Sequence, residues 1–242
     1  MPLFLVVGMS NVPRIRSLEI AITYVCNVKC HNCNSLCTQA PVKQSTDMTV
    51  DQVRRFVDES VACSYPWERL LLFGGEPTLH PNFLDICTLL YDYRLQHNRR
   101  VSLICCSNGS NPGKVDAAVK MGFEPHVSVK LKTNYPWSYE PVNISPVDRG
   151  IKGTPGCHWS YDCGIGMNTL GFWPCSPAGA AARVFGYAAP VTSVKDITAE
   201  RLMTMYSHCD HCGAGLVSEP RAMEQVSSPE WVAKLDAYNK RI

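Results

Sequence analysis

Three cysteines near the start of the chain, Cys26, Cys30 and Cys33, are spaced CxxxCxxC and follow the apolar segment 18–25. Thiolates at such close spacing are typical ligands of an iron–sulfur cluster, which normally takes four cysteines. With only three thiolates, one iron keeps an open position, and an open metal site can bind and activate a substrate. A zinc knuckle or three reduced thiols are the alternatives, although zinc sites usually combine CxxC pairs with a nearby fourth partner. The triplet therefore favours a cluster with one open iron.

A second motif follows the next apolar segment. Residues 69–73 are expected to form a strand, and the sequence Gly-Gly-Glu-Pro comes directly after it at positions 74–77. Glycines let a backbone approach a ligand closely, and a proline fixes the exit of a turn. An ordinary strand-to-helix turn is the alternative interpretation. Taken together, the cysteine triplet and this motif resemble the radical S-adenosylmethionine (SAM) superfamily.

The resemblance implies a cofactor and a reaction. Cys26, Cys30 and Cys33 would hold a [4Fe–4S] cluster, and the amine and carboxylate of SAM would chelate its open iron. An electron from the reduced cluster would then cleave SAM and give a 5′-deoxyadenosyl radical, which abstracts a hydrogen atom from the substrate. The protein would position the reactants and exclude water.

Candidate SAM-binding residues also follow from the resemblance. Glu76 would accept charge-assisted hydrogen bonds from the SAM ammonium, and His31 would lie near the adenine. Contacts to the ribose and to the SAM carboxylate are implied for the end of the third strand and for a lysine in the fourth. The alternatives are a solvated loop histidine, an ordinary Ser-Asn-Gly turn and a solvated lysine. The full set is His31, Gly74, Gly75, Glu76, Pro77, Ser107, Asn108 and Lys130.

A second group of cysteines lies in the C-terminal third of the chain. Its order, with one cysteine, a hairpin, a second cysteine, a helix and a close CxxC pair, resembles the twitch/SPASM branch of the superfamily. The resemblance implies an auxiliary [4Fe–4S] cluster held by Cys157, Cys175, Cys209 and Cys212, with Cys163 as a spare or as a replacement for Cys157. Four thiolates leave no open iron, as expected for a structural or electron-transfer role. A four-cysteine zinc site is the alternative.

A single auxiliary cluster resembles the dehydrogenases that oxidise the aminocyclitol 2-deoxy-scyllo-inosamine. This implies a two-electron oxidation of a small polar alcohol, in which the last electron leaves through the auxiliary cluster. Such a reaction needs a basic or hydrogen-bonding group at the substrate hydroxyl. Asp148 and Arg149 are the catalytic candidates, with an exposed ion pair as the alternative. Trp159, Tyr161 and Asp162 are further candidates for lining the pocket.

Two other functions stay open at this point. One is a radical SAM enzyme that modifies a peptide, by thioether formation or epimerisation. The other is a zinc-binding interaction protein without catalysis, which would be colourless. For the two catalytic interpretations, the expected partners are a small-molecule or peptide substrate and an electron donor of the flavodoxin or ferredoxin type.

Alternating apolar segments explain how these residues would be brought together. Strands are expected at 18–25, 69–73, 101–106 and 126–131, with helices at 49–61, 81–96 and 114–121. Thr49 and Gln52 are placed to form a capping box. Strands that alternate with helices form parallel sheets, whose sites lie at the carboxyl ends of the strands. The resemblance implies an α/β fold with a partial (β/α)6 TIM-like barrel; a fifth strand is expected within 139–147, and no sixth strand is recognisable.

The C-terminal part has a different character. Residues 164–173 alternate like a hairpin, and helices are expected at 198–206 and 229–241. The expected division is a barrel core at 1–150 and a small twitch module with a C-terminal helix at 151–242.

Composition excludes several classes of function. The 242 residues carry a net charge of +2, which is too small and too dispersed for nucleic-acid binding. No apolar run is long enough for a membrane span, and the apolar segment 2–7 lacks the features of a signal peptide. The 13 cysteines are odd in number and occur in metal-like spacings. We therefore expect a reduced, cytoplasmic protein.

Overall fold

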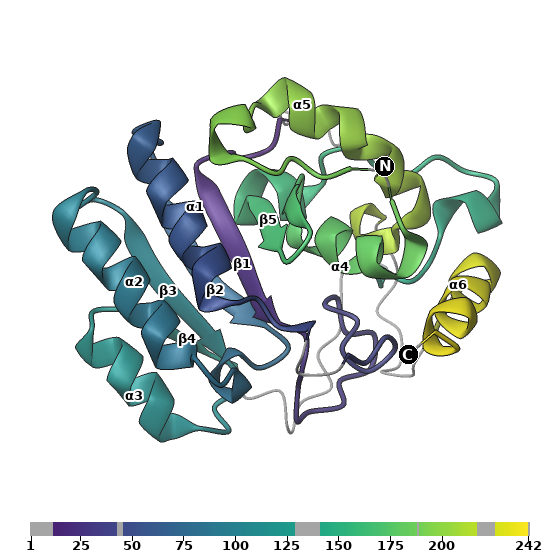
Figure 1. Cartoon of the computed structure of the whole chain (residues 1–242). Coiled ribbons are helices and arrows are strands. Elements are labelled where there is room, and N and C mark those ends of the chain that lie inside the picture. The colour runs from purple at the N-terminus through teal and green to yellow at the C-terminus, as the bar shows by residue number, and fades with distance from the viewer. Residues whose placement is uncertain (1–11, 43–45, 129–140, 188, 217–225, 242) are drawn as a thin grey trace, which may run out of the picture.

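A computed structural model describes residues 12–42, 46–128, 141–187, 189–216 and 226–241. Its centre is a six-stranded sheet in the order β4-β3-β2-β1-β5-β6 (Figure 1). All neighbouring strands are parallel except β5 and β6, which form an antiparallel hairpin. The strands are β1 (Ser17–Thr23), β2 (Arg69–Gly74), β3 (Ser102–Ser107), β4 (Glu124–Val127), β5 (Ile165–Asn168) and β6 (Gly171–Trp173).

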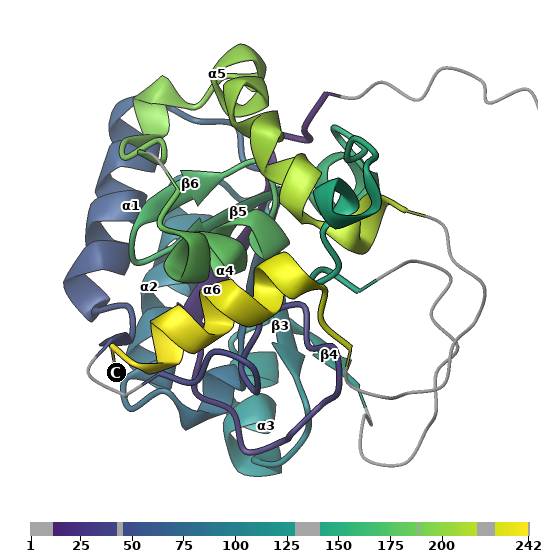
Figure 2. The same cartoon turned by 90° about the vertical axis from the view of Figure 1, so that its right-hand side faces the viewer.

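Helices lie on both sides of this sheet. Those on one face, α1, α2 and α3, follow β1, β2 and β3 in turn, and α4 and α6 lie on the opposite side of β1, where α6 crosses α4 (Figures 1 and 2). The helices are α1 (Val50–Ala62), α2 (Phe83–Gln96), α3 (Pro112–Lys120), α4 (Ser176–Phe185), α5 (Ala199–Met203) and α6 (Pro229–Asn239). This mixed α/β arrangement is consistent with the expected partial TIM-like barrel.

Strand β1 is buried on both faces, as expected for a central parallel strand. Leu18, Ile20 and Ile22 are fully buried in the main core beneath α1 and α2, whereas Ala21 packs into a second apolar cluster beneath α4 and α6. The sheet therefore presents one face to a mainly apolar layer. Its other face carries the side chains that can do chemistry.

The sequence-based boundaries agree with the structure in most of the described elements. Thr49 caps α1, and its side chain and that of Gln52 form the predicted capping box. The expected hairpin is present as β5 and β6. The helix expected at 198–206 is shorter, because α5 passes into a 3₁₀ helix at Thr204–His211.

The predicted fifth strand is wrong for the residues that the structure describes. Residues 141–145 form no strand, and a 3₁₀ helix occupies Pro146–Arg149. Pro141 and Pro146 bracket this run, and proline cannot donate a ladder hydrogen bond. The position beside β1 is instead taken by β5, which pairs with it from Leu18 to Ile20. The hairpin thus continues the main sheet, and the domain division near residue 150 stays a prediction.

None of the helices in the described part of the chain combines the length and the apolar character that a membrane crossing requires.

Candidate functional site

The cysteine loop leaves the carboxyl end of β1 and is held there by the Gly-Gly-Glu-Pro turn. The Gly75 amide donates to the carbonyl of Thr23 at 2.8 Å, and the Glu76 amide donates to that of Val25 at 2.9 Å. A Cβ atom on Gly75 would lie 2.3 Å from the Val25 oxygen and 3.0 Å from Cys26 Cβ. Only glycine permits this approach, so the motif fixes where the triplet begins.

The triplet lines a cavity of about 200 Å³, which we call the triplet cavity. Cys26, Cys30 and Cys33 all face it, together with Cys37 from the same loop. Burial raises the pKa of the Cys26 thiol, so metal binding, which needs thiolates, must displace a proton there. The Cys26 sulfur accepts from the Val28 amide at 3.4 Å. Three soft donors around one volume suit an iron–sulfur cluster.

The predicted SAM-binding residues divide into two groups. Gly74, Gly75, Ser107 and Asn108 line the triplet cavity. Among the described residues that line it, His31, Glu76 and Pro77 are not found; His31 is exposed on the loop, and Pro77 is buried at the start of a 3₁₀ helix. Lys130 lies outside the described residues.

Glu76 is fully buried and fastens the ends of β2 and β3 together. Its carboxylate accepts from the Thr78 amide at 3.1 Å and the Thr78 hydroxyl at 2.6 Å. It also accepts from the Ser107 hydroxyl at 2.8 Å and the Asn108 amide at 2.6 Å. A carboxylate has about four acceptor sites, so these contacts nearly saturate it. In this structure Glu76 organises the loop that borders the cavity, and direct contact with SAM stays a prediction.

The four predicted auxiliary ligands line one second cavity: Cys157, Cys175, Cys209 and Cys212. Burial raises the pKa of all four thiols, that of Cys209 to about 12. Close backbone packing brings the segments together, since a Cβ on Gly153 would lie 1.8 Å from the Cys209 oxygen and one on Gly215 would lie 3.2 Å from Cys157 Cβ.

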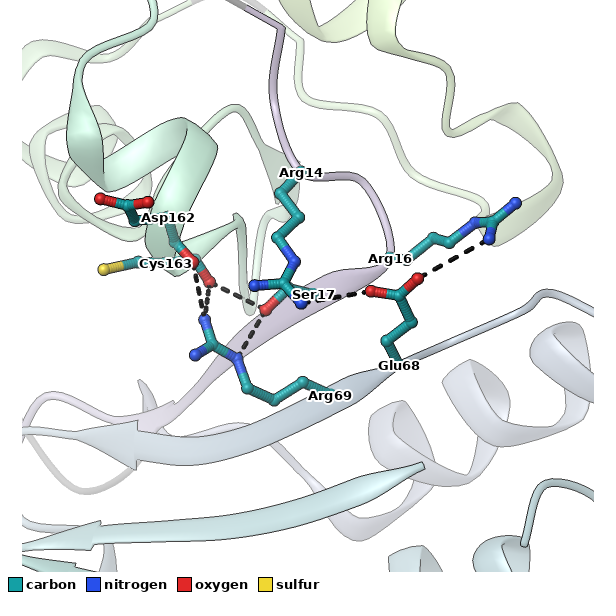
Figure 3. Close-up of polar contacts among 7 residues, drawn as sticks. All are labelled: Arg14, Arg16, Ser17, Glu68, Arg69, Asp162 and Cys163. Carbon is teal, nitrogen blue, oxygen red and sulfur yellow. Dashed lines mark hydrogen bonds and ion pairs between the residues drawn. The ribbon is translucent and has the colours of Figure 1, made fainter. Parts of the chain in front are cut away.

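Cys163 does not line the second cavity within the described residues. It ends a π-helical turn, Trp159–Cys163, that is tied to the opposite end of the sheet (Figure 3). Arg69 Nε donates to the Ser17 hydroxyl at 2.7 Å, and its guanidinium also donates to the carbonyls of Asp162 and Cys163. The Cys163 sulfur points away from these contacts (Figure 3). The geometry therefore favours Cys157 over Cys163 as the cavity ligand.

The two cavities share a wall. Trp159 and Pro177 line both of them, and neighbouring residues at the start of α4 divide between them: Cys175 faces the second cavity and Ser176 the triplet cavity. Trp159 was a predicted pocket residue, whereas Tyr161 and Asp162 line neither cavity in the described structure.

The prediction that Asp148 and Arg149 are catalytic is not supported by their position. Both are exposed in the 3₁₀ helix Pro146–Arg149, and neither lines either cavity as described. Asp148 accepts from the Glu230 amide at 3.0 Å at the start of α6. Hydrogen bonds from Ser228 and from this amide lower the pKa of Asp148. Its carboxylate is thus engaged in holding a helix end.

Sequence reasoning did not single out several residues of the triplet cavity, among them Glu19, Cys37 and Ser176. Glu19 lies within an apolar strand pattern, and a single acidic residue in such a run reads as an exposed position. Cys37 carries no metal spacing with respect to the triplet. Ser176 belongs to α4, a helix that the sequence did not predict. The one available signal was the charge of Glu19 inside a strand expected to be buried.

No three Cys, His, Asp or Glu side chains of the described residues converge closely enough to hold a single metal ion. Zinc holds each thiolate about 2.3 Å from one centre, whereas the ligands of a cluster surround a larger object. Both cysteine groups surround a cavity. The three thiolates around the triplet cavity fit a cluster, and metal analysis distinguishes a cluster from zinc at the second cysteine group.

An α/β sheet with an open cysteine triplet at the end of its first strand defines a class of metal-dependent enzymes, and comparisons with known proteins identify it. The family model described as the radical SAM superfamily matches residues 20–140. The chain belongs to the radical SAM superfamily. Membership implies SAM and a [4Fe–4S] cluster as cofactors.

Curated relatives match only in part. The chain is 39% identical over 69 residues to a GTP 3′,8-cyclase of Mannheimia succiniciproducens, a match that covers 28% of this chain and 20% of the relative. It is 32% identical over 98 residues to a GTP 3′,8-cyclase of Synechococcus elongatus, covering 40% of this chain and 28% of the relative. The chain therefore spans less than a third of the length of these relatives.

A solved structure matches over nearly the whole length. The structure of BtrN in complex with AdoMet and 2-DOIA aligns with a TM-score of 0.54 at 12% identity, covering 88% of this chain and 97% of that one. At this level of identity the similarity shows a shared fold.

Proposed function

We propose that this protein is a radical SAM oxidoreductase that removes two electrons from a small polar alcohol. In this proposal, Cys26, Cys30 and Cys33 hold the SAM-binding cluster. The four cysteines of the second cavity hold an auxiliary [4Fe–4S] cluster in a twitch-like arrangement. When bound, these groups supply a 5′-deoxyadenosyl radical that abstracts a hydrogen atom and an acceptor for the electron left on the substrate.

The wall shared by the two cavities carries this proposal. Trp159 and Pro177 contribute to both linings, so a molecule in the triplet cavity would lie next to the residues around Cys175. Electron transfer from the substrate to the second cysteine group would then cross only this wall. The fold shared with BtrN supports the same class of reaction, because that structure contains AdoMet together with 2-DOIA.

The chain's own residues would prepare this reaction by positioning and shielding. Gly74 and Gly75 line the cavity beside the triplet. Asn108 donates to Asn27 Oδ1 at 2.9 Å, which ties the end of β3 to the cysteine loop. Leu71 and Phe73 line the cavity from β2 and would exclude water from a reactive intermediate. A flavodoxin- or ferredoxin-type protein is the proposed source of electrons.

Two cysteine variants test the proposal. Cys30→Ala should abolish the cleavage of SAM to 5′-deoxyadenosine, because it removes a ligand of the open cluster. Cys212→Ala should retain SAM cleavage but stop formation of the oxidised product, measured by mass spectrometry under anaerobic conditions with a panel of amino alcohols and cyclitols. Retained product formation in Cys212→Ala would contradict the electron-transfer role of the second site.

Other radical SAM activities are distinguishable in the same assays. The partial identity to GTP 3′,8-cyclases makes GTP a necessary member of the substrate panel. Modification of a peptide, the remaining alternative, predicts SAM cleavage that no small alcohol stimulates.

A further inference from the structure

Glu19 lies at the middle of the sheet and faces the triplet cavity. It is 8% exposed, while its neighbours Leu18 and Ile20 are fully buried on the other face of β1. In the sheet register it stands between Leu71 of β2 and Gly166 of β5. Burial of a carboxylate in such a place costs free energy unless the group is compensated, so its partners decide what it can do.

Glu19 is only partly compensated. The Ser176 hydroxyl donates a hydrogen bond to Glu19 Oε2. Burial raises the pKa of the Glu19 carboxyl, while this hydrogen bond and the positive charge of Arg69 oppose the rise. A carboxylate accepts about four hydrogen bonds, so it retains acceptor capacity toward the cavity. Glu76, the other buried acid of the described residues, is occupied by four donors from its own loops.

Close packing holds Ser176 against Glu19. A Cβ on Gly166 would lie 2.7 Å from Ser176 Cα and 2.8 Å from the Cys175 oxygen, so β5 needs a glycine there for α4 to approach. Ser176 is the residue after Cys175, which lines the second cavity. The pair of Glu19 and Ser176 therefore stands at the wall between the two cysteine groups.

The charge of the cavity indicates what it can bind. Among the described residues that line it, Glu19 is the one ionisable side chain other than cysteine. A carboxylate attracts a cationic or hydroxylated group and repels a phosphate or another carboxylate. The lining thus suits an amino alcohol better than a phosphorylated substrate.

We propose that Glu19 is the catalytic residue that binds the reacting hydroxyl of a small amino alcohol and accepts its proton. This inference rests on the proposed function. Oxidation of the carbinol to a carbonyl removes one hydrogen atom from carbon, one proton from oxygen and one electron. Glu19 takes the proton. SAM bound at the triplet would supply the radical that removes the hydrogen atom, and a cluster held by the four cysteines of the second cavity would supply the electron acceptor.

The test compares Glu19→Gln with Glu68→Gln, the same change at an exposed residue paired with Arg14. The probe is 2-deoxy-scyllo-inosamine, and the readouts are iron content, SAM cleavage, equilibrium binding of the probe and its oxidation. Glu19→Gln should keep its iron and cleave SAM, bind the probe about 10-fold or more weakly and oxidise it about 100-fold or more slowly. Glu68→Gln should match the unmodified protein in every readout.

Several results would overturn the inference. Equal probe binding and oxidation in Glu19→Gln and Glu68→Gln would remove the role of Glu19. An unmodified protein that cleaves SAM but does not bind the probe would refute the substrate class, while one that binds the probe but does not cleave SAM would refute the proposed function alone. If Glu19→Gln loses iron, the Ser176→Ala variant provides the test, because it leaves the Glu19 carboxylate in place. Probe binding should persist in Ser176→Ala. Loss of probe binding in that variant would show that Glu19 and Ser176 have only a structural role.

Discussion

Single residues in this protein act mainly by fixing where loops end. Glu76 does so with a carboxylate that gathers donors from the ends of β2 and β3, and Gly75 does so by having no side chain beside Val25. Both belong to a motif that the sequence singled out for SAM binding. The structure adds that the motif also builds the frame that holds Cys26.

Replacing Glu76 with glutamine should lower the free energy of unfolding by about 1–3 kcal/mol, because an amide cannot satisfy four donors and brings two donors of its own. Urea unfolding of the reconstituted protein measures this loss. Glu124→Gln, at an exposed position beside His126, is the matched control. A loss no larger than that of the control would contradict the role assigned to Glu76.

The substitution Gly75→Ala should reduce the iron content of the purified protein by about half, because it would move Cys26 out of position and so remove one of the two proposed [4Fe–4S] clusters. The added Cβ would contact the Val25 oxygen at 2.3 Å, which neither backbone segment can relieve without a shift. A Cβ added at Gly113 in α3 would lie 4.0 Å from its nearest neighbour, Asn111 Oδ1. Gly113→Ala should therefore retain iron and gain about 0.5–1 kcal/mol of stability. Equal iron in both variants would refute this argument.

Helices and strands determine which residues meet. The approach of α4 to β5 brings Cys175 into one cavity and Ser176 into the other, and the π-helical turn Trp159–Cys163 delivers Trp159 to both. The start of α1 is equally well defined, by the capping box of Thr49 and Gln52. The contribution of this capping box to stability can be tested with a single substitution.

Thr49→Ala should destabilise the protein by about 1 kcal/mol, the usual cost of losing an N-cap, because the Gln52 amide loses its acceptor at 3.1 Å. Thr88→Ala, on the exposed face of α2, should change the stability by less than about 0.5 kcal/mol. Thermal unfolding of both variants measures the difference. If the two variants unfold alike, the cap contributes nothing.

At the scale of the whole molecule, two cysteine groups far apart in sequence border one shared wall. If each holds a [4Fe–4S] cluster, the chain should carry about eight irons. The Cys212→Ala variant should carry about four, and so should Cys26→Ala. Zinc in place of iron in the second site would end the proposal of an auxiliary cluster.

Removing the metal should also destabilise the fold, because ligands that bind only the folded state add their binding free energy to its stability. Treatment with a chelator under reducing conditions should lower the Tm, with each 1 kcal/mol lost corresponding to about 2–4 °C for a chain of this size. Reconstitution with iron and sulfide should restore the original Tm. An unchanged Tm after complete iron loss would show that the segments around Cys157 and Cys209 pack without a cluster.

The sequence by itself determined the local features of this protein. The triplet, the glycine-rich turn, the capping box of α1 and the β5–β6 hairpin are set by side chains a few residues apart, so spacing is enough to predict them. The sequence analysis did not predict helix α4, whose buried residues are mostly small.

Only the tertiary structure decided which distant residues share a cavity. In the structure, β5 lies beside β1, and Cys157 rather than Cys163 lines the second cavity with the other three cysteines. Asp148 lies at the surface, and Glu19 lines the triplet cavity. The reason is physical: these outcomes depend on the register of strands and on close backbone packing between segments up to about 150 residues apart, and such long-range contacts leave no periodic signal in the chain.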